Sequence, residues 1–249
     1  MAILELSSLR KAFGGLVAAD DVTVSVAPNA IHGLIGPNGA GKTTLFSLIT
    51  GFYRADSGTV RFDGADVTGL TTSARARRGL LRTFQSNLLF ADQTVLENVA
   101  SGALISRPRR AFDWLYERKA DRVEANAMAR QFLDFCHLSD KADAAARDLS
   151  HGQQRVLGIA VALAARPRLL LLDEPFTGMT AREKDDLAAM IQAIRAQGTT
   201  IILVEHDMRA VMRLCDRITV LNFGKVLAEG TPEQVRRHPD VMAAYLGTA

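Results

Sequence analysis

The sequence predicts an α/β fold around a largely parallel β-sheet, and three observations lead to this prediction. Residues 168–228 alternate between apolar, β-branched runs and helical periods, which is typical of parallel strands joined by helices. A glycine-rich loop at residues 36–41 stands between a short apolar run and a helical one. Residues 90–165 are mostly helical by period, which indicates an insertion into the alternating core.

Composition favours one compact unit. The 249 residues include 48 % hydrophobic ones, enough for a substantial core and a subdomain. A net charge of +3 permits anionic partners without requiring nucleic acid. No run approaches the roughly 18–20 apolar residues that cross a bilayer, and no basic leader precedes an apolar segment, so we expect a cytosolic location. Cys136 and Cys215 lack metal-ligand spacing, and we expect them to be buried rather than disulfide-bonded.

The first third is rich in predicted strands. The expected strands are residues 3–9, 22–26 and 30–35. Asp63 and Gly64 form a turn pair between residues 58–62 and 65–67, which predicts a hairpin. Residues 43–50 form a helix that Gly51 ends.

The rest of the chain begins helical and ends in alternation. The expected helices of the middle are residues 95–104, 117–135 and 152–165. Thr180 and Glu183 form a capping box for a helix that ends at Gly198. The other expected elements are strands 168–173, 200–205, 218–221 and 225–228 and a helix at 207–214. We expect residues 1–84 and 166–249 to form the core of one domain, with a helical subdomain at about 85–165.

The loop at residues 36–43 fits the phosphate-binding pattern G-x-x-x-x-G-K-[ST]. Its glycines let successive amides surround phosphate oxygens, and the following helix directs its positive end at the same anion. Lys42 is placed to reach the β- and γ-phosphates, and the Thr43 hydroxyl to bind Mg²⁺. A turn that binds nothing is the alternative, but it would not bring the lysine, strand and helix together. The residues assigned to nucleotide binding here are Gly36, Pro37, Asn38, Gly39, Ala40, Gly41, Lys42, Thr43 and Thr44.

Two further segments follow in a fixed order, LSHGQ at residues 149–153 and LLLLDE at residues 169–174. Together with the phosphate loop they resemble the ATPase subunits of ABC transporters, which use ATP binding and hydrolysis to move solutes through separate membrane proteins. The resemblance covers essentially the whole chain. It implies a P-loop NTPase fold of the ABC type, with a mixed or parallel sheet core, an antiparallel β subdomain and an inserted helical subdomain.

The resemblance assigns roles to five side chains. It implies that Asp173 helps hold Mg²⁺ through water and that Glu174 is the general base for the attacking water. His206 matches the residue that contacts the γ-phosphate, and Gln85 the one that contacts Mg²⁺ and moves with the membrane partner. Phe13 matches the aromatic residue that stacks on adenine. The alternatives are acids that only solvate a strand end, a structural histidine, and a core phenylalanine.

The LSHGQ segment opens a predicted helix, with Ser150 as N-cap and exposed amides that can bind phosphate. The resemblance implies that Ser150, His151, Gly152 and Gln153 complete the ATP site of the opposite subunit. His151 stands where glycine is usual, and Thr180 where aspartate is frequent. Because threonine also caps helices, we expect that loop to keep its shape.

Two basic stretches receive less specific interpretations. Residues 75–78 are expected to form a solvated helix face, and residues 107–110 to begin a surface insertion. Contact with lipid headgroups or a partner is the alternative for both.

The resemblance is strongest to the ATPases of branched-chain amino acid importers and their urea and amide relatives. The stretches that carry it are residues 84–90, 94–99, about 106–122, 205–208, 230–233 and 239–247. It implies ATP and Mg²⁺ as cofactors. It also implies two permeases, a second ATPase that is a non-identical paralogue or a second copy, and an extracytoplasmic binding protein, at the cytoplasmic face of the membrane. One alternative is a lipopolysaccharide-export ATPase, which is shorter where this chain has the insertion. The other is a soluble ABC ATPase, a class that usually carries a long coiled coil or two ATPase units, neither of which this sequence shows.

Overall fold

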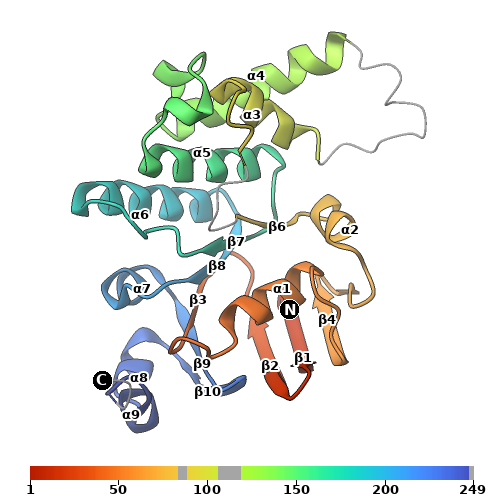
Figure 1. Cartoon of the computed structure of the whole chain (residues 1–249), viewed down its shortest axis with the longest axis vertical. Helices are drawn as coiled ribbons and strands as arrows, with labels where there is room; N and C mark the ends of the chain where they lie inside the picture. Colours follow the sequence, from red (N-terminus) through yellow and green to blue (C-terminus); the bar gives the residue numbers. More distant parts are fainter. Residues whose placement is uncertain (84–88, 106–118, 247–249) are drawn as a thin grey trace.

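The structure, a computed structural model, describes residues 1–83, 89–105 and 119–246. Its described strands form a six-stranded sheet in the order β10-β9-β3-β8-β7-β6 and a four-stranded sheet in the order β2-β1-β4-β5 (Figure 1). The larger sheet contains β3 (Ile31–Ile35), β6 (Leu80–Arg82), β7 (Leu169–Asp173), β8 (Thr200–Val204), β9 (Arg217–Asn222) and β10 (Lys225–Gly230). The smaller contains β1 (Leu4–Phe13), β2 (Leu16–Val26), β4 (Ser57–Phe62) and β5 (Ala65–Asp66).

The larger sheet is parallel except at one edge. β3 pairs in parallel with β8 and β9, and β7 with β8 and β6, whereas β10 runs antiparallel to β9. Every residue of β3, β7 and β8 is buried, as expected for strands covered on both faces. The predicted α/β fold with a parallel core is therefore confirmed.

The smaller sheet is antiparallel, and its first two strands are longer than predicted: β1 continues to Phe13 instead of ending at residue 9. β2 begins at Leu16 rather than at residue 22, because Phe13 and Leu16 already pair across a tight turn at Gly14, whose φ is +58°. Residues 16–22 lie in a part of the pairing with register shifts, and they include two aspartates. They therefore lack the alternation of apolar and polar residues by which a strand is predicted from the sequence. The predicted hairpin at Asp63 and Gly64 is confirmed.

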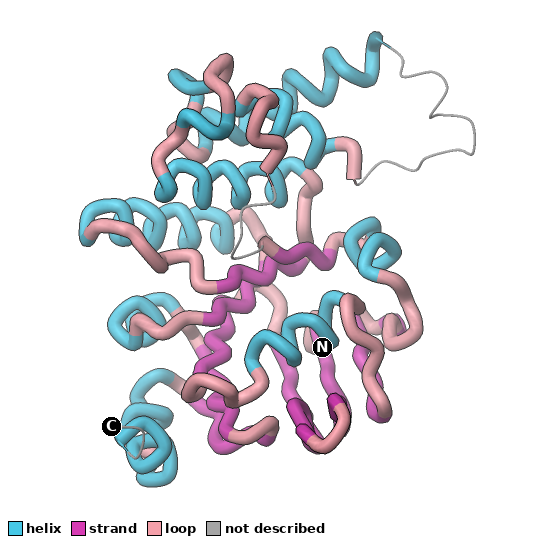
Figure 2. The backbone as a smooth tube through the Cα atoms, in the orientation of Figure 1, coloured by secondary structure: helices cyan, strands magenta, loops and turns pink. Residues whose placement is uncertain are grey.

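Figures 1 and 2 show how the helices are arranged around the two sheets. α1 (Lys42–Thr50) lies beside the smaller sheet, and α3 (Val95–Ala103), α4 (Lys119–Phe135) and α5 (His151–Ala164) lie together beyond α6 (Ala181–Ala196). The remaining helices are α2 (Thr72–Arg77), α7 (Met208–Leu214), α8 (Pro232–Arg236) and α9 (Pro239–Leu246). A division of the chain into core and helical subdomain stays a prediction.

Two apolar clusters cover opposite faces of the larger sheet. Leu170 and Leu172 face the cluster shared with the helices from α3 to α9, whereas Leu169 and Leu171 face the cluster shared with α1 and the smaller sheet. This alternation follows from the two-residue period of a strand. The leucine run therefore joins both layers of the fold.

Arg75 contradicts the expected solvated face at residues 75–78. It is 2 % exposed, and its guanidinium donates hydrogen bonds to the Leu48 and Ile49 carbonyls at 2.8 and 2.6 Å. These are carbonyls of the last turn of α1, which lack partners within the helix. Arg77 and Arg78 are exposed as expected. Arg75 thus adds to the cap that Gly51 forms, and a short basic run does not reveal which of its members faces a helix end.

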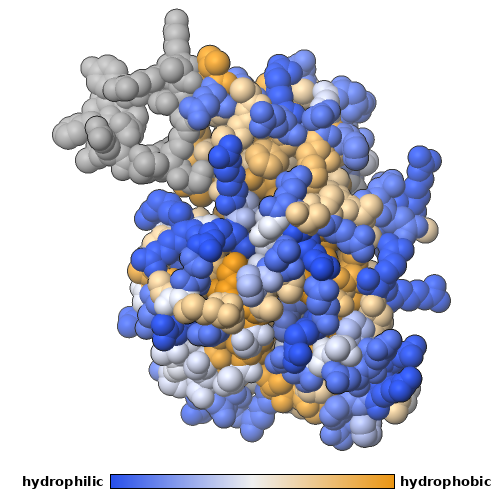
Figure 3. Space-filling model, turned by 180° about the vertical axis from the view of Figure 1, so that it is seen from behind, coloured by the Kyte–Doolittle hydropathy of each residue, from blue (hydrophilic) through white to orange (hydrophobic). Residues whose placement is uncertain are grey.

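The face turned away in Figure 1 is mostly hydrophilic, with separate hydrophobic areas among charged side chains (Figure 3). Among the helices of the described residues, none combines the length and apolarity needed to cross a membrane. Cys136 and Cys215 are both buried, as predicted, and neither forms a disulfide.

Candidate active site

The phosphate loop leaves β3 in a conformation that requires glycine. Gly41 has a φ of +100°, and a Cβ atom there would lie 2.2 Å from the Ala18 carbonyl oxygen on β2. A Cβ on Gly36 would lie equally close to the Leu221 carbonyl oxygen on β9. The loop is thus held between strands of both sheets, with its backbone in direct contact with each.

The first turn of α1 is open to an anion. Its N-cap is Gly41, which supplies no side-chain cap, and the turn contains no acidic residue. Lys42 is 7 % exposed and donates hydrogen bonds from Nζ to the Gly36 and Pro37 carbonyl oxygens at 2.7 and 2.9 Å. Burial lowers the pKa of Lys42, and the nearby carboxylates of Glu174 and Asp173 oppose this. Amides, helix dipole and ammonium group together are suited to hold an anion.

A pocket of about 480 Å³ lies over this loop. It is lined by Leu16, Val17, Ala18, Asn38, Gly39, Ala40, Gly41, Lys42, Thr43, Thr44, Glu174, His206 and Phe223. The structure therefore brings Glu174 and His206 to the same pocket as most of the predicted loop residues. Leu16 and Phe223, which are 69 % and 84 % exposed, line it as well and were not predicted.

Glu174 contacts His206 directly. Glu174 Oε1 lies 2.5 Å from His206 Nε2. Glu174 has a φ of +47°, which costs a non-glycine residue about 1–2 kcal/mol. Its amide donates to the Val204 carbonyl at 2.9 Å, and its carbonyl accepts a hydrogen bond from Arg155 Nη1 of α5 at 2.7 Å. These two bonds hold the strained residue at the end of β7.

Asp173 has a partner that the sequence analysis missed. Its Oδ2 lies 2.6 Å from Arg82 Nη2, and both side chains are less than a tenth exposed. Arg82 ends β6, which pairs with β7, and it also lies 3.3 Å from the Ser47 hydroxyl of α1. An arginine ending an apolar run was the available signal, but only the strand order reveals its partner.

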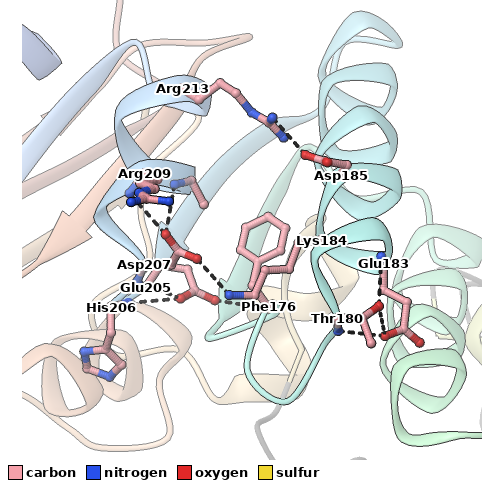
Figure 4. Close-up of polar contacts among 11 residues, drawn as sticks. Phe176, Thr180, Glu183, Lys184, Asp185, Glu205, His206, Asp207, Arg209 and Arg213 are labelled. Carbon is pink, nitrogen blue, oxygen red and sulfur yellow. Dashed lines mark hydrogen bonds and ion pairs between the residues drawn. The ribbon is translucent and has the colours of Figure 1, made fainter.

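Glu205 is another residue whose role the sequence did not indicate. It is 3 % exposed and accepts backbone hydrogen bonds from Phe176, His206 and Asp207, whose amide nitrogens lie 2.8, 3.0 and 3.4 Å from its carboxylate (Figure 4). Burial raises the pKa of Glu205, and the three amide bonds oppose this. Its signal in the sequence was an acid at the end of an apolar strand.

The C-terminal helix also reaches the loop. The Tyr245 hydroxyl of α9 accepts a hydrogen bond from the Gly36 amide, and burial raises the pKa of Tyr245 to about 12. Nothing in the sequence linked these two residues.

The remaining predicted residues lie outside the pocket lining. Phe13 is 41 % exposed, so the core alternative is wrong, and its ring lies edge-on to Tyr53 with centroids 5.1 Å apart. Gln85 and most of the insertion at 106–122 fall outside the described residues. Ser150 caps α5 and forms a capping box with Gln153. His151 is exposed. A Cβ on Gly152 would lie 2.7 Å from a Glu183 carboxylate oxygen. Contacts of these residues with nucleotide stay predictions.

The oxygen donors fit a magnesium ion that is shared with phosphate. No group of three or more His, Cys, Asp or Glu suited to hold a metal occurs in the described part of the chain. Mg²⁺ in nucleotide sites typically takes only one or two protein oxygens, with phosphate and water completing the shell. The Thr43 hydroxyl in the pocket lining is a donor of this kind, and so is the Asp173 carboxylate, which lies outside that lining and is paired with Arg82.

Comparison with known proteins agrees with this geometry. The sequence profile of the family "ABC transporter" matches residues 19–177, and that of "Branched-chain amino acid ATP-binding cassette transporter" matches residues 225–249. The chain is 43 % identical to the high-affinity branched-chain amino acid transport ATP-binding protein BraF of Pseudomonas aeruginosa, over 99 % of this chain and 98 % of that one. It is 41 % identical to the corresponding LivG of Escherichia coli K12, with the same coverage.

A solved structure and a more distant relative complete the comparison. The ADP conformation of an ATP-binding cassette of an ABC transporter superposes with a TM-score of 0.87, at 32 % identity and over 99 % of both chains. The lipopolysaccharide export ATP-binding protein LptB of Haemophilus influenzae is 35 % identical, over 99 % of this chain and 98 % of that one.

Proposed function

Because this chain belongs to the ABC transporter family of ATP-binding proteins, we propose that it is the ATP-hydrolysing subunit of an importer for branched-chain amino acids or related small amides or urea. The pocket that unites the phosphate loop with Glu174 and His206 carries the ATPase part of this proposal. The identity to BraF and LivG and the C-terminal profile match support the importer over the lipopolysaccharide exporter.

Nucleotide binding relies on the loop and the start of α1. The amides after Gly41 and the Lys42 ammonium bind the β- and γ-phosphates, and on binding Lys42 exchanges its carbonyl partners for phosphate oxygens. Thr43, Asp173 and Gln85 would hold Mg²⁺, which neutralises developing charge on the phosphates. Phe13 stacks on the adenine.

Hydrolysis relies on Glu174 and His206. Glu174 orients a water molecule in line with the γ-phosphorus and accepts its proton as the new P–O bond forms and the bond to ADP breaks. His206 donates a hydrogen bond to a γ-phosphate oxygen. The 2.5 Å contact between these side chains keeps both at one end of the pocket.

Coupling to transport requires other chains. We propose that Ser150, His151, Gly152 and Gln153 close over the nucleotide of a second ATPase subunit. Two permeases, and an extracytoplasmic binding protein in the same system, would complete the importer. The chain would then act at the cytoplasmic face of the membrane, with α3, α4 and α5 moving as ATP closes the dimer.

Two substitutions test the ATPase mechanism. Glu174→Gln should keep ATP binding but lower turnover by roughly 10²–10³-fold, because the general base is lost. Lys42→Ala should lose ATP binding, because the phosphates lose their ammonium partner. Hydrolysis at the wild-type rate by the first variant, or unchanged affinity in the second, would refute the role of that residue.

Purification of the tagged chain from its native membranes tests the transporter assignment. We expect a second ATPase and two permeases to copurify. A lipid-export assembly would favour the runner-up, and exclusively soluble partners would refute the transport role while leaving the ATPase role intact.

A further inference from the structure

We propose that Glu205 is a positioning residue that fixes Glu174 and His206 relative to each other. This inference rests on the proposed ATPase function. The carboxylate lies where the loop after Glu174 and the loop that begins at His206 meet (Figure 4). No role for it follows from the phosphate-binding or hydrolysis steps described above.

The geometry divides the carboxylate between the two loops. Oε1 accepts the Phe176 amide at 2.8 Å, and this residue lies two positions after Glu174. Oε2 accepts the His206 amide at 3.0 Å and the Asp207 amide at 3.4 Å. One rigid group thus sets the separation of the two backbones whose side chains meet 2.5 Å apart.

Burial makes this arrangement demanding. A carboxylate that is 3 % exposed is costly unless its oxygens are hydrogen-bonded. Because its donors come from both loops, moving either loop away would leave a buried oxygen without a partner. The low-energy state is therefore the one in which both loops donate to the Glu205 carboxylate. In that state Glu174 and His206 are held next to each other.

Residues of α6 and α7 also hold the loop that begins at His206. Lys184 Nζ of α6 lies 2.8 Å from Asp207 Oδ2, while Asp207 Oδ1 accepts the Arg209 and Ala210 amides and caps α7. With α7 and α6 tied in this way, Glu205 joins the loop that begins at His206 to the loop after Glu174.

Glu205→Gln tests the role, because a side-chain amide offers one acceptor oxygen and must direct its NH₂ group at one loop's N–H. We expect kcat to fall roughly 10–100-fold, since small displacements of reacting groups are costly. The Kd for MgATP should stay within about 2-fold, because the phosphate loop is untouched. In a His206→Ala background the same substitution should lower kcat less than about 3-fold, because the pair that Glu205 aligns is already broken.

Glu97→Gln is the matched control. Glu97 also accepts a backbone amide, that of Thr94, at 2.8 Å in the capping box of α3, away from the pocket. The kcat of the Glu97→Gln variant should equal that of the wild type. If Glu205→Gln does not fold, Glu205→Asp, whose shorter carboxylate cannot reach both loops, replaces it in every comparison.

A readout independent of turnover completes the test. The ¹⁵N resonance of His206 Nε2, assigned among the chain's five histidines by its loss in His206→Ala, should shift in Glu205→Gln and not in Glu97→Gln. An unshifted resonance, unchanged kcat, or an equal loss in both backgrounds would overturn the role of Glu205. Failure of the proposed function would instead appear as equal hydrolysis by wild type and Glu174→Gln.

Discussion

The phosphate loop and the two loops that carry Glu174 and His206 border one pocket but are held in different ways. The phosphate loop is a backbone structure, fixed by direct contact of Gly36 and Gly41 with the carbonyls of neighbouring strands. The other two loops share one backbone bond, from the Glu174 amide to the Val204 carbonyl, and depend beyond it on side chains, those of Glu205 and of Arg155 of α5.

In the proposed mechanism, this difference separates nucleotide binding from hydrolysis. A site made of backbone and glycine has few alternative shapes, so it is suited to hold the phosphates constantly. A site held by side chains from two different layers can lose its geometry when those layers move. Rotation of α5 would act on the Glu174 carbonyl and leave the phosphate loop unchanged.

The largest expected effect is that of Gly41→Ala. The new Cβ would lie 2.2 Å from the Ala18 carbonyl at a φ that disfavours side chains, so the loop must shift. We expect affinity for MgATP, measured by titration calorimetry, to fall by about 10³-fold. Gly39→Ala is the control, because its φ is +78° but nothing lies within 4 Å of the added atom. Comparable losses in both variants would show that strain alone, and not the close approach of β2, shapes the loop.

Acid should weaken the strand that supports the loop. His32 on β3 lies 2.8 Å from the Thr219 hydroxyl on β9, and burial lowers its pKa from 6.5 to about 4. The folded state keeps His32 neutral, whereas the unfolded chain takes up a proton below pH 6.5. Stability is therefore complete above pH 6.5 and is lost as the pH falls towards 4, by about 3 kcal/mol at most.

Denaturant unfolding of wild type and His32→Gln between pH 7.5 and 4.5 measures this loss. Both chains share all other titrations, so the difference between their free energies of unfolding should narrow or reverse towards low pH. A constant difference would remove His32 as the source.

The smallest expected effect is that of Arg155→Gln. The variant loses the bond to the Glu174 carbonyl, and the strained residue can relax. We expect kcat to fall by about 10-fold with unchanged Kd, and Arg155→Lys to restore part of it. Arg147→Gln, which breaks an exposed ion pair with Asp92, should change neither quantity. A fall in affinity rather than in kcat would contradict the separation of binding from hydrolysis.

The phosphate loop could be predicted from the sequence, whereas the contacts that hold the other two loops could not. Gly36 to Thr43 form a local pattern whose chemistry depends on neighbours in the chain, so the loop and its helix were predictable. The leucine run before Asp173 and the capping boxes at Ser150 and Thr180 were predictable for the same reason.

The residues that were missed act across long sequence separations. Arg82 meets Asp173 only because β6 and β7 are neighbours, and Glu205 meets Phe176 only because β7 and β8 are. Arg75 was misjudged because its partners lie at the end of another helix. Such pairings depend on strand order and packing, which periodicity does not contain.

The position of β3 within its sheet has a consequence for synthesis of the chain. Both neighbours of β3 come from late in the sequence, and Asn29 bonds to Thr200, 171 positions away. At about 5–20 residues per second, a ribosome would take roughly 10–40 s to deliver these strands after β3 has emerged. During that interval the glycine loop lacks the contact with Leu221 that shapes it. A nascent chain should therefore acquire nucleotide binding only after β8 and β9 have been made. Until then both edges of the apolar strand β3 are unpaired.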